Sequence, residues 1–268
     1  MKLIPTAIAL AALLGGLAQP TQAATIVYQN DFNAPVGWTD QSGNGTQISF
    51  AQVNSLYGSA FQQTFTVETI KVAGNPNYSD PSGTGGAYTL GMLSAVQNDL
   101  LSLTFNVGSL SFVNVMMDFA GMGPVACPSC GGPFGFAGQT PIFDLRLYDT
   151  PSGTFNLASP GTQLSAAAMT GNVIASTTTL GWDNRTSSLS TVGNTNGRVT
   201  VVFDLRAGAG MAGYAAFDNI VIASSDVAGD VGGGGGGVPP AIPEPSTTAL
   251  MGLGLLGLLG VAKRARRR

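Results

Sequence analysis

Short stretches of alternating or continuous apolar residues recur along the middle of the chain, and clusters of turn-forming residues separate them. In residues 142–149 (IFDLRLYD), every second residue from Phe143 to Leu147 is apolar, and the residues between them are charged. A period of two is what an antiparallel strand with one buried face requires. Comparable patterns predict further strands in residues 24–32, 60–73, 100–121, 172–182, 198–207 and 214–224.

The segments between these strands favour turns. Residues 75–86 (NPNYSDPSGTGG), 183–188 (DNRTSS) and 193–198 (GNTNGR) are rich in residues that accept turn geometry. Residues 163–169 form the one segment that suggests a helix, and that helix would be short. Many short strands with few helical signals predict an all-β fold. We expect an antiparallel β-sandwich of jelly-roll type, like that of galactose-binding and other carbohydrate-binding modules.

The two ends of the chain differ from this middle part. Lys2, an apolar run and then Thr21-Gln22-Ala23 form the pattern of a secretory signal peptide. Cleavage is expected after Ala23, with Ala24 as the alternative, and a permanent N-terminal anchor is disfavoured because the apolar run is short. Six consecutive glycines, 232–237, hold a fold poorly and indicate a linker. The sequence therefore predicts a signal peptide (1–23), a β-sandwich (24–228) and a Gly/Pro-rich linker (229–242).

Charge is distributed unevenly. Five of the eleven basic residues lie in the last six positions, and from Ala24 to Asp230 five basic residues face thirteen acidic ones, a net charge of −8. A body this acidic is repelled by phosphate backbones, so we expect no nucleic-acid partner. The chain also contains no histidine. That absence excludes Ser-His and Cys-His nucleophile pairs and histidine-ligated metals, whereas chemistry that uses two carboxylates stays open.

The C-terminal tail has three parts in a fixed order. Pro243-Glu244-Pro245 comes first, an apolar segment follows over residues 247–262, and basic residues end the chain. As a helix the apolar segment would be about 24 Å long, somewhat short for a bilayer core of about 30 Å. The basic cluster would hold its end on the cytoplasmic side. That cluster consists of Lys263, Arg264, Arg266, Arg267 and Arg268.

This tail resembles the PEP-CTERM sorting signal, over residues 243–268. The resemblance implies a Gram-negative source and recognition by exosortase, a membrane-embedded transpeptidase. It also implies a route: export across the inner membrane, tethering of the precursor by the C-terminal hydrophobic helix, processing near the motif, and delivery to the cell surface or extracellular matrix. Polysaccharide is the expected later partner. The alternative is a permanent membrane anchor with an incidental Pro-Glu-Pro.

Cys127 and Cys130, in the stretch CPSC, are the only cysteines. Exported thiols meet oxidising conditions, so the sequence favours a local disulfide between them. Free thiols are one alternative. A redox or metal site is another, although neither the βαβ context of a redox motif nor two further zinc ligands are visible.

Two aspartates lie on the first and last predicted strands. Asp31 and Asp218 have the oxygen-rich neighbours Asn30, Asn33 and Asn219, which suit a hard cation such as calcium. Many jelly-roll carbohydrate-binding modules hold a structural calcium between these strands. The alternative is that both aspartates cap turns or face solvent. Apart from this calcium, no cofactor is expected.

Trp38 and Trp182 each lie near an aspartate and either stack on sugar rings or pack in the sandwich. The preferred hypothesis is an exported, non-enzymatic surface or matrix protein associated with exopolysaccharide. A carbohydrate-binding module or adhesin with a defined sugar site is the second hypothesis. A secreted glycosidase with two catalytic carboxylates is the third; Glu68 and scattered aspartates are its only candidate acids.

Overall fold

The computed structural model describes residues 23–42, 45, 47–65, 67–94, 98–123, 137–151, 155–176 and 178–232. Five predicted features lie wholly or largely outside these residues: the signal peptide (except its last residue), the predicted Cys127–Cys130 disulfide, the linker beyond residue 232, the Pro243-Glu244-Pro245 motif and the tail with its predicted hydrophobic helix and basic cluster. Within the described ranges, no helix has the length and apolar character needed to cross a membrane.

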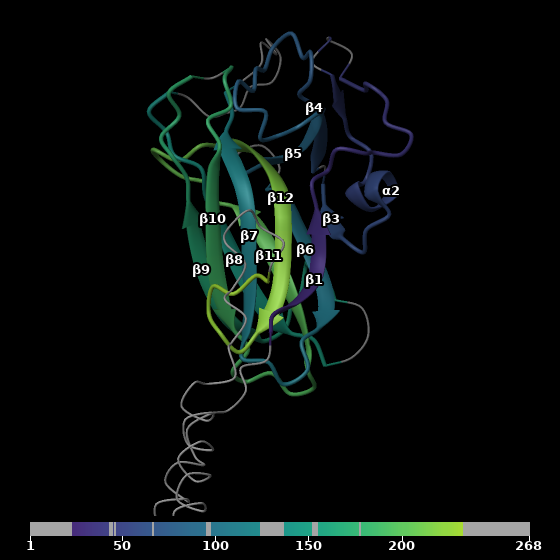
Figure 1. The fold of residues 1–268 in the computed structure, drawn as a ribbon, viewed down its shortest axis with the longest axis vertical. Helices are drawn as coiled ribbons and strands as arrows, with labels where there is room; N and C mark the ends of the chain where they lie inside the picture. Colours follow the sequence, from purple (N-terminus) through teal and green to yellow (C-terminus); the bar gives the residue numbers. More distant parts are fainter. Residues whose placement is uncertain are drawn as a thin grey trace, which may run out of the picture. The chain divides into compact units, whose positions relative to one another are not determined.

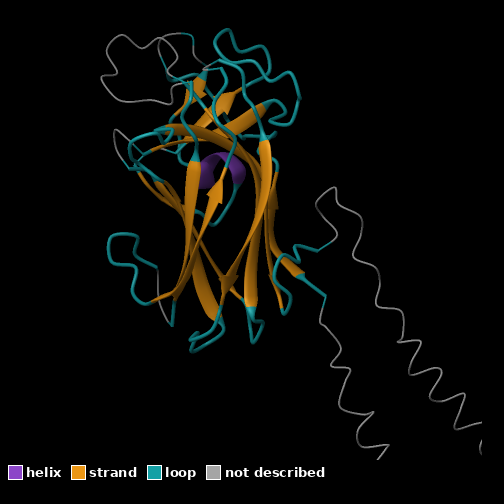
Figure 2. Cartoon of the chain, turned by 90° about the vertical axis from the view of Figure 1, so that its left-hand side faces the viewer, coloured by secondary structure: helices purple, strands orange, loops and turns teal. Residues whose placement is uncertain are grey.

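Antiparallel strands form two sheets that face each other (Figures 1 and 2). The larger sheet has the order β10-β7-β12-β5-β4-β2, with β1 also paired to β12; the smaller has the order β3-β6-β11-β8-β9. The larger sheet contains β1 (Thr25–Asn30), β2 (Ile48–Ser49), β4 (Glu68–Lys71), β5 (Tyr88–Leu93), β7 (Phe112–Gly121), β10 (Asp183–Ser190) and β12 (Tyr214–Ser225). The smaller contains β3 (Gln62–Thr64), β6 (Leu100–Asn106), β8 (Ile142–Asp149), β9 (Gln163–Thr170) and β11 (Arg198–Leu205). A single helical turn, α2 (Val53–Tyr57), completes the described elements.

The connections between strands confirm the jelly roll. From β5 to β12 the chain changes sheet at every step except between β8 and β9, which are neighbours. Within the two sheets, the strands β10-β7-β12-β5 and β6-β11-β8-β9 therefore have the interlocked order of a double-sheet jelly roll. The last strand, β12, lies between β7 and β5. Much of the strand pairing therefore joins segments that are distant in the sequence.

The core lies between the two sheets, as the alternating patterns predict. Phe143, Leu145 and Leu147 of β8 are fully buried and contribute to the main apolar cluster. Across the core, Phe119 of β7 and Phe217 of β12 meet Phe143 edge to face, with ring centroids 5.3 and 5.5 Å apart. Edge-to-face aromatic pairs of this kind stabilise cores beyond simple area burial.

Three local predictions were wrong. Residues 163–169 form strand β9 rather than a helix, because pairing with β8 over nearly its whole length overrides the local helix preference of its alanines. Residues 183–188 belong to β10, whose eight residues all pair with β7, rather than to a turn. Among the described residues 172–176 and 178–182 there is no strand, only an isolated bridge at Thr179.

Strand β5 was not predicted, and the predicted strand 60–73 is divided into β3 and β4. Gly91 weakens the strand pattern of β5, but little space is left for a side chain at this position. A side chain there would place its Cβ 2.7 Å from Ile70 Cδ1 and 2.9 Å from the Tyr214 hydroxyl. Glycine inside a strand often marks such a close approach.

Candidate functional site

Strand β12 changes partner halfway along its length. Its first part pairs with β5 up to Phe217↔Leu90, and its last part pairs with β1 from Ile220↔Asn30. The junction between β1 and β5 therefore lies opposite Asp218 and Asn219, where the register with β7 also shifts. Asn219 adopts a positive φ of 49° at this irregularity. Bulges of this kind are common beside functional sites because they redirect side chains.

Asp218 is the most unusual residue at this junction. Its side chain is fully buried, and Oδ1 accepts a hydrogen bond from the Asn219 main-chain N–H at 2.6 Å. Oδ2 is buried without a hydrogen-bond partner. Burial, together with the charges of Asp31, Asp118 and Asp80, raises the pKa of Asp218 to about 8. A carboxylate in this setting requires a proton or a cation to compensate its charge.

The structure brings the two predicted calcium ligands, Asp31 and Asp218, to the same junction. Asp31 follows the end of β1 and accepts a hydrogen bond from the Asn33 N–H at 3.2 Å, so it also caps a turn. Asn33 Oδ1 in turn accepts from the Ala87 N–H at 2.6 Å, which links the end of β1 to the start of β5. Asp31 therefore caps a turn, as the alternative interpretation of these two aspartates predicted. Asp218 does not follow that alternative, because it neither faces solvent nor caps a simple turn.

Loop 80–86 covers the junction. Asp80 holds the loop in shape, because its two carboxylate oxygens accept hydrogen bonds from the N–H groups of Gly83 at 3.1 Å and Gly85 at 2.8 Å. The Asn219 amide then ties the loop to the sheet. Its Nδ2 donates both to the Thr84 carbonyl at 3.0 Å and to Asp118 Oδ2 at 2.8 Å.

A metal ion at this junction would need carbonyl or amide oxygens as ligands in addition to carboxylate oxygens. Within the ranges that the structure describes, no three acidic, histidine or cysteine side chains converge closely enough to hold an ion by themselves. Calcium, however, accepts carbonyl and amide oxygens among its six to eight ligands. The unpartnered Oδ2 of Asp218 is one oxygen available here; Asp118 is the register partner of Asp218, and the adjacent Asn219 links Asp118 to the Thr84 carbonyl.

Trp182 lies against loop 80–86 at Gly85. A Cβ at Gly85 would lie 2.4 Å from Cζ2 of the indole, so only glycine allows the ring to rest on the loop. Trp182 is half-buried, and its Nε1 has no hydrogen-bond partner. Two residues after Trp182, Asn184 of β10 connects this segment to the junction. Its Nδ2 donates a hydrogen bond to Asp118 Oδ1 at 2.8 Å.

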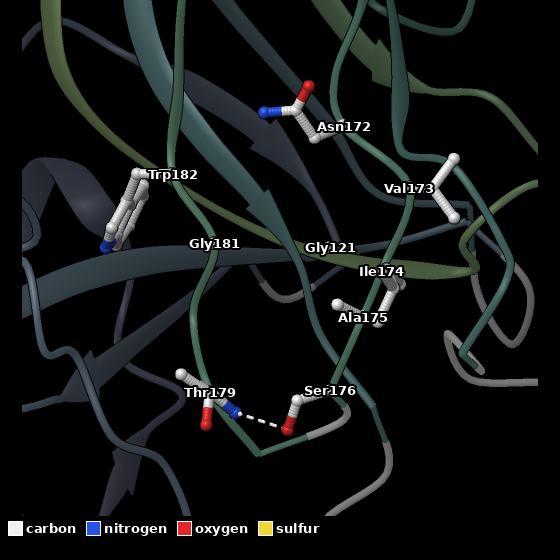
Figure 3. Close-up of a pocket in the computed structure, with 9 residues that line it drawn as sticks. All are labelled: Gly121, Asn172, Val173, Ile174, Ala175, Ser176, Thr179, Gly181 and Trp182. Carbon is white, nitrogen blue, oxygen red and sulfur yellow. Dashed lines mark hydrogen bonds between the residues drawn. The ribbon is translucent and has the colours of Figure 1, made fainter.

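A pocket of about 290 Å³ opens beside Trp182 (Figure 3). The indole lies on one side of it, Val173 and Ile174 lie on the other, and Gly121 and Gly181 lie between them. Polar side chains occupy the remaining edges, and the Thr179 N–H donates to Ser176 Oγ at 3.2 Å. The complete lining is Gly121, Asn172, Val173, Ile174, Ala175, Ser176, Thr179, Gly181 and Trp182.

Trp38 has a different environment. Its ring packs edge to face on Tyr88 with a centroid distance of 5.4 Å, and it does not line the Trp182 pocket. Both tryptophans have packing contacts, because Trp182 packs against the second apolar cluster of the core, but only Trp182 also lines the pocket. Apart from Trp182, the pocket residues were missed by sequence reasoning, because most belong to the segment 172–182 that was predicted to be a strand.

Glu68, the candidate glycosidase acid, is buried away from the pocket lining. The Tyr214 hydroxyl donates a short hydrogen bond to its Oε2. Burial raises the pKa of Glu68 to about 7; the bond from Tyr214 opposes this shift, and the charge of Asp99 adds to it. The carboxyl group is thus held within the larger sheet rather than presented to a ligand.

Comparison with known proteins identifies the tail. A family model described as the PEP-CTERM protein-sorting motif matches residues 241–268. The C-terminal tail is thus a PEP-CTERM sorting motif, as the residues predicted, and it marks the chain as an exported protein sorted by exosortase. No curated protein matches the chain.

Several solved structures share a similar arrangement of strands. The CBM22-1 xylan-binding domain of Paenibacillus barcinonensis Xyn10C is 10% identical, with 77% of this chain and 98% of that domain covered and a TM-score of 0.40. TmCBM61, in complex with β-1,4-galactotriose, is 12% identical, with 61% and 88% covered and a TM-score of 0.34. The Stig cyclase Fisc of Fischerella sp. TAU is 11% identical, with 75% and 98% covered and a TM-score of 0.37.

Proposed function

We propose that this chain is an exported, non-enzymatic surface or matrix protein whose β-sandwich binds neutral polysaccharide at the Trp182 pocket. In this proposal the signal peptide is removed after Ala23 during export. The hydrophobic tail then tethers the precursor in the inner membrane until exosortase processes it. The mature domain reaches the cell surface or the extracellular matrix, where the pocket holds the protein on exopolysaccharide.

The observation that carries the proposal is the composition of the pocket around Trp182. An aromatic face opposite an apolar wall suits the C–H faces of a sugar ring, and Asn172, Ser176 and Thr179 supply hydrogen-bonding groups at the edges. The volume of about 290 Å³ suits a small unit of a chain rather than a long stretch of polymer. An indole beside a few polar groups is a common way to bind an amphipathic ring.

The charge of the site favours a neutral ligand and binding rather than hydrolysis. None of the residues that line the pocket is charged, while the chain from Ala24 to Asp230 carries a net charge of −8. Uronic-acid polymers would be repelled by such a body. Glycoside hydrolysis requires a pair of carboxyl groups about 5 to 10 Å apart at the bound sugar. No acidic side chain lines this pocket in the described part of the chain.

Replacing Trp182 with alanine should release the mature protein from the matrix. Trp182 is the one aromatic residue among those that line the pocket, so we expect binding to weaken by roughly tenfold to a hundredfold. The measurement is the distribution of the protein between the matrix and the growth medium of a producing strain.

Phe65→Ala is the matched control, because Phe65 is 61% exposed and does not line the pocket. It should leave the distribution unchanged. A Trp182→Ala protein that folds, is processed and stays in the matrix like the wild type would refute the sugar-binding role of the pocket.

A further inference from the structure

The Trp182 pocket and the start of the linker lie at opposite ends of the larger sheet. Trp182 directly precedes β10, Gly121 is the last residue of β7, and both line the pocket. At the other end of β7, Phe112 pairs with Ser225, the last residue of β12. The ten residues of β7 separate these two ends by roughly 30 Å at the usual rise of a strand.

A hydrogen-bonded turn after β12 fixes the chain just before the linker. The turn is held by the fully buried Asn114 of β7, whose Nδ2 donates to the carbonyls of Val227 at 3.0 Å and Asp230 at 2.7 Å. Asn114 Oδ1 accepts a hydrogen bond from the Gly229 N–H at 2.9 Å. The same N–H donates to Ser188 Oγ of β10 at 2.8 Å. We call this turn, with the two side chains that hold it, the C-terminal clamp.

Strands β10, β7 and β12 run side by side between these two ends (Figure 1). A pull on the tail enters the sheet at the end of β12 and, through the clamp, at β7 and β10. A ligand held at the pocket pulls on the opposite end of β10. Because the hydrogen bonds of antiparallel pairs are perpendicular to the strands, such a load acts on them in shear. All eight residue pairs between β10 and β7 then resist it together.

A pull through the N-terminus acts differently on the sheet. Thr25, the first residue of β1, pairs with Ser224 near the end of β12, so β1 starts at the end of the sheet where β12 finishes. A pull that separates residue 24 from the tail would therefore open the pairs between β1 and β12 one after another. Strand β1 has only six residues, and its register is interrupted between Ile26 and Tyr28. This direction should resist a load poorly.

We propose that the domain is a load-bearing link, in which the C-terminal clamp passes a pull on the tail into β7 and β10 toward the Trp182 pocket. The proposal rests on the function proposed above, because a load arises when the pocket holds polysaccharide while the tail is held elsewhere. It adds a mechanical property to that function: the domain stays folded under tension along its strands. This property requires no sugar and is measured on the protein alone.

Single-molecule pulling on the full chain in detergent tests the direction of this strength. One pair of covalent handles joins Arg268 to position 181, where Gly181 is exposed and an added Cβ would meet no atom within 4 Å. A second pair joins Arg268 to residue 24. At one constant force, the folded domain should survive at least roughly tenfold longer with the first pair, since the unfolding rate governs forced unfolding. Equal lifetimes, or a longer lifetime with the second pair, would overturn the load-bearing link.

Asn114→Ala tests the clamp. With handles at position 181 and Arg268, it should shorten the lifetime by roughly tenfold, because the load then enters through β12 alone. With handles at residue 24 and position 181 the pull bypasses the clamp, so the loss should be much smaller. A loss of the same size in both directions would reveal a general destabilisation and overturn the role of the clamp.

Two further variants complete this test. Ser188→Ala removes a single hydrogen-bond partner of the turn, so it keeps the fold and should shorten the lifetime in the same direction by roughly twofold to fivefold. Asn54→Ala, at an exposed asparagine on α2, is the matched control and should behave like the wild type in both directions. An unchanged lifetime in both Asn114→Ala and Ser188→Ala would also overturn the clamp.

The pulling measurement is independent of sugar binding. A domain that withstands the load along its strands but binds no neutral glycan would refute the function proposed for the pocket and leave the load-bearing geometry standing. A domain that binds neutral glycan but unfolds equally fast in both directions would overturn the load-bearing link alone.

Discussion

Glu68→Gln is expected to stabilise the domain at pH 8 and to have much less effect at pH 5. Glu68 lies in β4 with only 7% of its surface exposed, and its pKa in the folded protein is about 7. The unfolded group ionises near 4.5. The folded state therefore holds a proton that the unfolded state has lost, and the stability that this proton provides is present below pH 4.5 and is lost as pH rises through 7.

The amide keeps the acceptor that Tyr214 needs but never ionises, so the variant avoids this loss. Between pH 5 and pH 8 the difference in unfolding free energy between variant and wild type should change by on the order of 3 kcal/mol in favour of the variant. Urea denaturation at the two pH values measures it, with calcium removed throughout. Asp226→Asn removes an exposed charge and should show no comparable change. A Glu68→Gln advantage of the same size at both pH values would contradict the buried, proton-holding state of Glu68.

Glu244→Gln is expected to abolish the processing of the tail. Glu244 is the only charged residue between Asp230 and Lys263, and the prolines on both sides lack backbone N–H groups and fix φ. We therefore expect the single carboxylate to be the feature that a processing enzyme recognises. The variant should accumulate in the membrane fraction with its C-terminal segment intact, as measured by intact-mass spectrometry.

Ser246→Ala, two residues further along, is the matched control and should be processed like the wild type. Glu244→Asp, which keeps the charge on a shorter side chain, should retain more processing than Glu244→Gln. If Glu244→Gln protein were released and shortened at the wild-type rate, recognition of the Pro243-Glu244-Pro245 motif through its carboxylate would be disproved.

Much of the fold could be predicted because the alternation of apolar and polar residues in a strand shows which of its faces is buried. The alternation in β8 places Phe143, Leu145 and Leu147 in the core, and the all-β class and jelly roll follow from many such segments. Strands β9 and β10 were missed because their sequences are polar or rich in alanine. They are strands because β8 and β7 pair with them, and pairing between distant segments leaves little trace in a local pattern.

The candidate site could be predicted only in part, for a related reason. Asp31 and Asp218 stood out because they lie near the first and last strands, which pair in the fold. Three other residues did not stand out: Asp80, Asp118 and Gly85. They come together only in the fold, where the pairing partner of β12 changes from β5 to β1 at Asp218. The sequence DPSGTGG reads as an ordinary turn, and nothing local shows that an indole more than ninety residues away rests on its glycine.

Direct binding of neutral glycans to the mature protein tests the central claim most simply. Isothermal titration calorimetry of the processed protein, with calcium present, should show saturable binding to a neutral polysaccharide from the producer's matrix and none to a polyuronate. The Trp182→Ala protein should lose that binding while the Phe65→Ala protein keeps it. Equal heats for both variants, or no binding of any neutral glycan by a folded and processed wild-type protein, would contradict the account.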